Sequence, residues 1–208
     1  MLDLAVLPGF LVAVALVTLA PGPDNTYIAA VALARGSRAG VLSAAGMSLG
    51  MVVHVSAAAL GLAVLLHSTA WVLTAVQLGG AAYLGWLAVT TLRAARRAAP
   101  LADAPPDGQL LKRAVLTNLT NPKVIIFFAA FLPQFTRPGH GPLAVQLLIL
   151  GLIFLLVGLL CDSAIGLTVG RLGRSVAPDG RGATTLTVVA GLTFATLALV
   201  LLAEVLLR

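Results

Sequence analysis

Six apolar runs, each about as long as a membrane-spanning helix, follow one another along almost the whole chain. They lie at residues 4–34, 41–66, 69–92, 114–135, 143–170 and 183–207. A hydrocarbon core roughly 30 Å thick needs about 20 apolar residues per helix. Since 60% of the 208 residues are apolar and only 10% are charged, little of the chain is left for a soluble domain. We therefore predict an all-α, polytopic membrane protein with six transmembrane helices.

The longest polar joint divides the chain into two halves of three runs each. Residues 95–112 are rich in Pro, Ala and charge, which predicts a cytoplasmic linker between a first three-helix repeat, 1–94, and a second, 113–208. Because three spans is an odd number, the two halves insert with opposite orientations, as inverted repeats do. The N-terminus has no basic start and no small-residue cleavage site, so we expect no removed signal peptide.

Most basic residues lie in the joints after the first, third and fifth runs. These joints hold ten of the 13 Lys and Arg residues: Arg35, Arg38, Arg93, Arg96, Arg97, Lys112, Arg113, Arg171, Arg174 and Arg181. Basic joints stay in the cytoplasm, so both termini should face outward. The net charge of +6 is therefore a topology signal and does not indicate nucleic-acid binding. If the first run re-entered instead of crossing, the N-terminus alone would face inward, and both arrangements stay open.

The first run contains a break that a helix in lipid should not tolerate. In "VTLAPGPDNTYIA", residues 17–29, Pro21-Gly22-Pro23 must interrupt the helix, because proline lacks an amide proton and clashes with the preceding turn. Such a break is tolerated only where protein or a water-filled cavity surrounds it. Asp24 and Asn25 follow, and we expect their side-chain oxygens to cap the amides of the second half-helix. The alternative is a capped kink with nothing bound.

A second break occupies the matching position in the second half. "LTNLTNPKVIIFF", residues 116–128, again places small polar residues and a proline before an ionisable residue, here Asn121, Pro122 and Lys123. Interrupted helices at corresponding positions of two halves indicate a transport site near the middle of the membrane, between inverted repeats. The breaks thus favour a transporter.

These motifs, in this order and spacing, resemble the LysE/RhtB family of bacterial amino-acid exporters over nearly the whole chain. The matching elements are Pro21-Gly22-Pro23, "RGSRAGVLSAAGMSLG" (35–50), "GGAAYLGWLA" before the basic linker, and Asn121-Pro122-Lys123 leading into "FFAAFLPQF". The resemblance implies a six-helix carrier of the bacterial inner membrane, not an enzyme. It would export small amino acids or derivatives, driven by the proton-motive force. The RhtB-like branch, with threonine, homoserine lactones and leucine as typical substrates, is favoured.

A zwitterionic substrate needs one partner for its carboxylate and another for its ammonium group. The amide ends of the half-helices and Lys123 suit the carboxylate, whereas Asp24 or Asp162 suits the ammonium group. The predicted substrate-binding residues are Pro21, Gly22, Pro23, Asp24, Asn25, Asn118, Thr120, Asn121, Pro122 and Lys123. The alternative is that Lys123 pairs with Asp24 or Asp162 as a structural strut.

The candidates for proton coupling are Asp162, Asp24 and His54. Histidine titrates near neutrality, and a desolvated carboxyl group is biased toward its protonated form. For His54 the alternative is a satisfied polar residue in a helix interface. For the lone cysteine, Cys161, we predict a packing role. We expect no cofactor and no metal. The expected partners are the substrate, protons and the lipid bilayer, and a homo-oligomer is left open.

A different class of protein must also be weighed. "GMSLG", residues 46–50, spells a serine-hydrolase string with His54 nearby, but that elbow needs a strand-to-helix turn. On a continuous helix Ser48 and His54 face different ways. We predict instead that Gly46 and Gly50 allow close contact with another helix. A channel-like pore and a non-transporting membrane scaffold remain the two alternatives to an exporter.

Overall fold

The structure is a computed structural model that describes residues 2–62, 70–94, 109–172 and 181–207. Within these ranges every regular element is helical, and no strand forms. The helices are α1 (Leu7–Leu19), α2 (Pro23–Arg35), α3 (Ser37–Ala57), α5 (Ala70–Ala94), α6 (Leu110–Leu119), α7 (Pro122–Ile126), α8 (Leu143–Leu172) and α9 (Arg181–Leu206). A 3-10 turn, Leu4–Val6, precedes α1, and a π-helical turn, Ala58–Leu62, extends α3. A π-helical turn, Phe127–Phe131, and a 3-10 turn, Leu132–Phe135, continue α7.

The helices coincide with the six apolar runs, and the all-α prediction is confirmed. Among the described residues, two helical segments, Ser37–Gly61 and Leu143–Leu172, are long and apolar enough to cross a membrane. Two bent pairs, Leu4–Leu19 with Pro23–Arg35 and Leu110–Leu119 with Pro122–Phe135, raise that number to four if each counts as one span. Most of the predicted linker, residues 95–108, lies outside the described residues, and α6 begins at Leu110.

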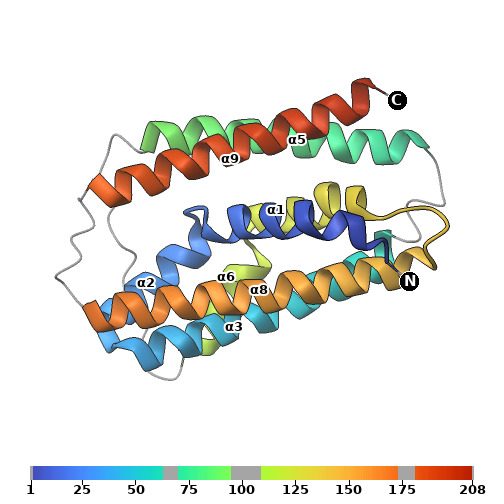
Figure 1. The fold of residues 1–208 in the computed structure, drawn as a ribbon. Coiled ribbons are helices and arrows are strands. Elements are labelled where there is room, and N and C mark those ends of the chain that lie inside the picture. Colours follow the sequence, from blue (N-terminus) through green and yellow to red (C-terminus); the bar gives the residue numbers. More distant parts are fainter. Residues whose placement is uncertain (1, 63–69, 95–108, 173–180, 208) are drawn as a thin grey trace.

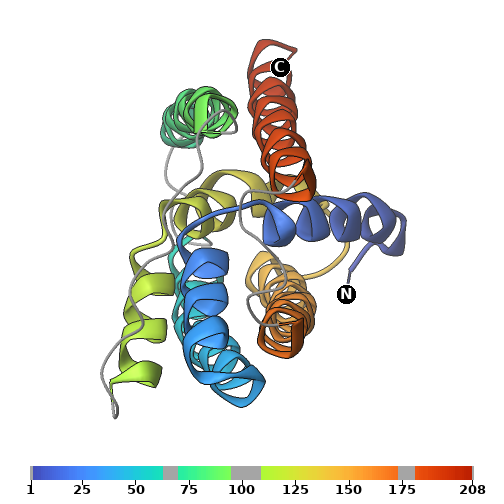
Figure 2. The ribbon, with the colours of Figure 1, turned by 90° about the vertical axis from the view of Figure 1, so that its left-hand side faces the viewer.

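The broken helices lie in the middle of the molecule. Figure 1 shows α5 and α9 side by side on one side, and α3 and α8 side by side on the other. Between these pairs run α1 and the segment that continues α7, and the view along the helices in Figure 2 shows the same order. The two breaks are therefore enclosed by helices.

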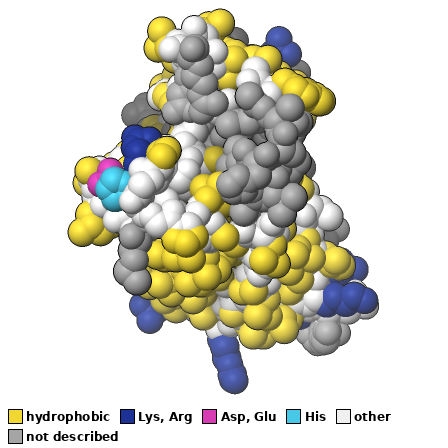
Figure 3. Space-filling model, turned by 90° about the vertical axis from the view of Figure 1, so that its right-hand side faces the viewer, with side chains coloured by type: hydrophobic (Ala, Val, Ile, Leu, Met, Phe, Trp, Pro, Cys, Tyr) yellow, Lys and Arg dark blue, Asp and Glu magenta, His cyan; other side chains and the backbone are white. Residues whose placement is uncertain are grey.

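The core and the surface are both apolar, but they differ in packing. Phenylalanine rings from α1, from the segment after α7 and from α8 form the centre of the core, with Phe127 and Phe154 at a ring-centroid distance of 4.6 Å. Large apolar side chains such as Leu160 and Trp71 are exposed, and hydrophobic side chains cover much of the face in Figure 3. So much exposed apolar surface fits helices surrounded by lipid.

Glycines set the distance between α3 and its neighbours. A Cβ added at Gly46 would lie 2.6 Å from Cβ of Ala114 in α6, and one at Gly50 would lie 2.9 Å from Oδ1 of Asn118. The predicted close contact at Gly46 and Gly50 is confirmed, with α6 as the neighbour. Because α3 runs as one helix from Ser37 to Ala57, Ser48 does not sit on a strand-to-helix elbow.

Candidate functional site

The first break bends its helix pair by 54°. The helix α1 ends at Leu19, and α2 begins at Pro23 after the extended residue Gly22. The side-chain amide of Asn25 donates to the carbonyl oxygens of Thr18 at 3.0 Å and of Ala20 at 3.3 Å. The expectation that Asp24 and Asn25 cap the start of α2 is therefore wrong. The start of α2 has no side-chain cap, and Asn25 instead caps the last carbonyls of α1, since these are the acceptors that the prolines leave unpaired.

The second break bends its pair by 43°, and a side chain caps the half-helix that follows it. Asn121 precedes Pro122, and its side-chain oxygen accepts a hydrogen bond of 3.0 Å from the backbone amide of Lys123. Thr120 is exposed, and its hydroxyl donates to the carbonyl of Leu116 in its own helix. Of the predicted residues at this break, Asn118, Asn121 and Lys123 are buried together, and Thr120 is not brought to them.

The two breaks are in direct contact. The ammonium group of Lys123, after the second break, donates to the carbonyl oxygen of Ala20, in the first break, at 3.0 Å. The side-chain amide of Asn118 donates to Oδ2 of Asp24, also at 3.0 Å. Residues about a hundred positions apart in the chain are thus joined by two buried hydrogen bonds. Pro21 and Pro23 shape this contact through the backbone, whereas Asp24, Asn118 and Lys123 make it through their side chains.

Three buried charges surround this contact. Asp24 and Lys123 are each 5% exposed, and Asp162, from α8, is 7% exposed. Both carboxylates interact electrostatically with Lys123, yet Lys123 donates to a backbone carbonyl and forms no salt bridge with either of them. The alternative prediction, a direct salt bridge between Lys123 and Asp24 or Asp162, is therefore not seen among these three side chains.

Several buried polar atoms at the breaks have no hydrogen-bond partner among the described residues. They are the second oxygen of Asp24, the side-chain oxygens of Thr18, Asn25 and Asn118, and the side-chain nitrogen of Asn121. Leaving such a group unpaired costs about 1–3 kcal/mol each. Buried polar groups in proteins are normally paired, so a cluster of unpaired ones at one place makes the breaks the candidate site.

His54 lies beside this cluster, but its side chain already has interaction partners. Its Nε2 is within 3.2 Å of the carbonyl oxygen of Asn118, and its ring stacks on Phe128 at 5.9 Å. This geometry fits the alternative for His54, a polar residue satisfied in a helix interface.

Sequence reasoning missed two residues of this region. Thr18, one turn before the first break, is buried with an unpaired hydroxyl. Tyr27 is buried in α2, and its hydroxyl donates to the carbonyl of Leu110 at 2.7 Å, which fastens α2 to the start of α6. Thr18 is a polar residue of the first apolar run and lies three positions before Pro21, and this position could have identified it. Nothing local marks Tyr27, since its partner is 83 positions away.

The fold and the site define a helical membrane protein whose two broken helices meet at a buried polar centre. Residues 15–205 match the model of the LysE type translocator family. The chain belongs to this family.

Named relatives indicate what kind of molecule the family contains. A homoserine/homoserine lactone efflux protein of Salmonella typhimurium is 37% identical over 150 residues, 71% of this chain and 72% of the relative. A threonine efflux protein of Escherichia coli K12 is 31% identical over 132 residues, 61% of this chain and 64% of the relative. An uncharacterised membrane protein of Pseudomonas aeruginosa is 35% identical over 158 residues, 73% of each chain. No solved structure matches the chain. The efflux relatives are transporters and not enzymes.

Proposed function

We propose that this protein exports small amino acids or their derivatives across the bacterial inner membrane, driven by the proton-motive force. The observation that carries the proposal is the buried contact between the two breaks, where one cation and two carboxylates lie among unpaired polar atoms. Placing charges within a membrane is costly, about 3 kcal/mol or more each on insertion scales, so three at one place need a function.

The groups at this centre match a zwitterion. Lys123 and the first amides of α2, which have no side-chain cap, suit the substrate carboxylate. The unpaired oxygen of Asp24, or the carboxylate of Asp162, suits the ammonium group. Because Lys123 is held by one carbonyl at 3.0 Å and not by a carboxylate, a substrate carboxylate could approach it without first breaking a salt bridge.

The same carboxylates are the proposed route for the proton. Asp162 accepts no hydrogen bond from the described residues and interacts with both Asp24 and Lys123. A carboxyl group that is alternately protonated and paired with a cation would couple proton entry to substrate exit. His54 is the weaker candidate, because its ring nitrogen already has a partner.

We further propose that the chain is an inverted repeat of six spans. The contacts between helices support it: α3 meets α8 and α5 meets α9, which pairs the second and the third helix of each half with its counterpart in the other half. Contacts between unlike helices also occur in a matched set, since α1 meets α8 as its counterpart α6 meets α3. A two-fold relation between the halves would produce this pattern.

The test of the proposed function is protection of cells by overproduction. A strain overproducing the protein should survive otherwise toxic concentrations of its substrate among amino acids and their lactones. The substrate should also accumulate in the medium faster than in a strain carrying the empty vector. Export that continues after the proton gradient is collapsed would favour a channel-like pore, and no change for any compound would favour a scaffold.

Lys123→Met should abolish binding and export while the protein still inserts. The change removes the cation of the centre and leaves its two carboxylates without that partner. We expect export to fall at least about 100-fold, in line with losing a charge-assisted contact. The matched control is Lys112→Met, which removes a lysine from an exposed position of α6. Equal export by the two variants would exclude Lys123 from substrate recognition.

Asp162→Asn should separate transport from its energy source. An amide has the size of the carboxyl group but cannot release a proton, so the variant should fold, bind substrate and lose gradient-driven accumulation in inverted vesicles. Exchange of labelled for unlabelled substrate, which needs no net proton transfer, should persist. If the variant keeps the wild-type response to an imposed pH gradient, Asp24 becomes the principal proton candidate.

A further inference from the structure

Seven of the eight buried glycines in the described part of the chain are needed for packing. A Cβ added at any of them would lie 2.9 Å or less from a neighbouring heavy atom, closer than real Cβ atoms come; they are Gly40, Gly46, Gly50, Gly80, Gly151, Gly166 and Gly191. The atoms that would be met belong to neighbouring helices, such as Val55 of α3 next to Gly151. These glycines let helices approach one another.

Gly158, in the middle of α8, is the exception. It is buried, but no atom of the described residues lies within 4 Å of the position that its Cβ would take. It follows Phe154 by one turn and precedes Asp162 by one turn, so all three lie on the same inward face of α8. On either side of this stretch α8 contacts α3, at Gly151 and at Gly166. Gly158 therefore borders an open space inside the molecule.

The two ends of this space differ in chemistry. Toward the start of α8, Phe154 packs against Phe127 at 4.6 Å and Phe128 at 5.2 Å, which makes an apolar wall. Toward its end, Asp162 is more than nine-tenths buried and has no hydrogen-bond partner among the described residues. An amino acid has the same polarity, with an ammonium group at one end and a side chain at the other.

The matching position of the first half is closed. Gly50 precedes His54 by one turn, as Gly158 precedes Asp162, but the space at Gly50 is filled by Asn118, whose Oδ1 would lie 2.9 Å from an added Cβ. The space at Gly158 is thus not a general consequence of a glycine at this point of the repeat. Of these two matching positions in the described part of the chain, only Gly158, one turn before Asp162, has this space.

We propose that Gly158 leaves the room for the side chain of the transported amino acid and so sets the largest side chain that the protein exports. This inference rests on the proposed function. With the ammonium group of the substrate at Asp162, its side chain extends toward Phe154 past Gly158. A larger residue at 158 would shorten that space without touching the groups that hold the ammonium and carboxylate ends.

The first arm of the test asks whether the space exists. Gly158→Ala should leave the thermal unfolding midpoint of the purified protein unchanged or raise it, because alanine favours a helix and meets no neighbour. The control is Gly151→Ala on the same face of the same helix, which should lower the midpoint because its Cβ meets Val55. A loss at Gly158→Ala as large as that at Gly151→Ala would overturn the inference.

The second arm measures export of alanine, threonine, leucine and phenylalanine by overproducing cells. Gly158→Leu should lower export of the largest transported member by about tenfold or more and change the smallest by less than about twofold. If the leucine variant fails to insert, Gly158→Ala should show the same order of effects at smaller size.

The outcomes of this second arm separate the two proposals. Wild-type protein that exports no member of the series, nor their derivatives, overturns the proposed function and this inference with it. Wild-type export with an unchanged or uniformly lowered profile in the Gly158 variants overturns the inference alone. A size-dependent loss supports both.

Discussion

At the scale of single residues, the first break creates the acceptor that holds the cation of the second. The carbonyl of Ala20 ends α1, and because Pro21 and Pro23 interrupt the ladder it is free to accept from Lys123 at 3.0 Å and from Asn25 at 3.3 Å. The negative end of the α1 dipole adds about 0.3–1 kcal/mol, and a hydrogen bond to a charged group about 1.5–3 kcal/mol. Burying an ion costs several kcal/mol, so the nearby carboxylates must supply the rest.

Gly22→Ala should weaken this contact. A Cβ at Gly22 would lie 3.3 Å from Nζ of Lys123 and 3.6 Å from its Cε, so the lysine must shift and its bond to Ala20 lengthen. We expect a loss of about 1 kcal/mol in the free energy of unfolding and several-fold slower export. Gly9→Ala is the control, since a Cβ there meets only Phe135, at 4.0 Å. A Gly22→Ala protein at least as stable and active as the Gly9→Ala protein would contradict the prediction.

At the scale of helices, each break exposes backbone groups: the last carbonyls of α1 and the first amides of α2. The bend of 54° turns the end of α1 and the start of α2 toward the same centre. The carbonyl of Ala20 meets Lys123 there, and the first amides of α2 face the proposed substrate site. The helix α3 supports this arrangement from outside, since Gly46 and Gly50 bring it against α6 and fix Asn118, the partner of Asp24.

Replacing Pro21 and Pro23 together with Ala should straighten the first helix pair. The restored ladder would pair the carbonyl of Ala20 within the helix and remove the acceptor of Lys123, so export should fall to background although the protein still reaches the membrane. Pro8→Ala is the control, because Pro8 lies in the first turn of α1, where proline is compatible with the helix. If substrate stabilises the double-Ala variant against heat as much as it stabilises the wild type, Pro21-Gly22-Pro23 only bends the helix and does not build the site.

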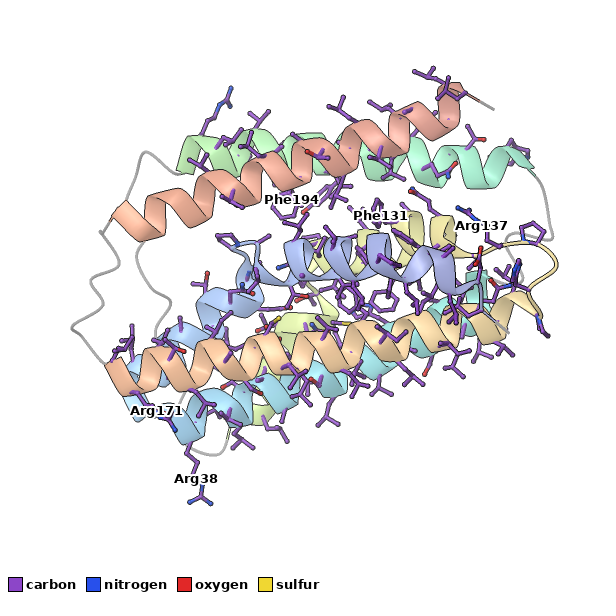
Figure 4. All side chains as sticks on the ribbon, in the orientation of Figure 1. Arg38, Phe131, Arg137, Arg171 and Phe194 are labelled. Carbon is purple, nitrogen blue, oxygen red and sulfur yellow. The ribbon has the colours of Figure 1, made fainter. Side chains whose placement is uncertain are left out.

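At the scale of the whole molecule, arginines lie at both ends of the helices. Arg38 and Arg171 lie at one end and Arg137 at the other (Figure 4). Both termini lie at the end of Arg137, and the turn between α2 and α3 lies at the opposite end. The bent pair of α1 and α2 therefore runs the length of the molecule, as a segment that crosses the membrane would.

Reporter fusions test the orientation of the whole chain. A reporter active only in the cytoplasm should be active when fused near Asp103, and one active only outside should be active after Arg208, because basic loops remain inside. A linker reporter that proves external would overturn both the orientation and the proposed relation between the halves. As a control, the two reporters are exchanged between the two positions. Each reporter should then be inactive.

The sequence by itself determined the features that depend on near neighbours in the chain. The helices follow from apolar run length, and the breaks follow from the missing amide protons of Pro21, Pro23 and Pro122. Hydrophobic length and proline chemistry act within a few residues, so they can be read without knowing the fold. The glycine contact of α3 was also predicted, since spacing of four is itself a packing signal.

Only the tertiary structure decided which groups meet. Lys123 binds the carbonyl of Ala20 and not a carboxylate, and Asn25 caps α1 and not its own helix, because the bend brings free carbonyls closer than the aspartates. Gly50 and Gly158 occupy matching places in similar stretches, yet one is filled by Asn118 and the other is open. The room beside a glycine is determined by the helix packed against it, and that helix comes from a distant part of the chain.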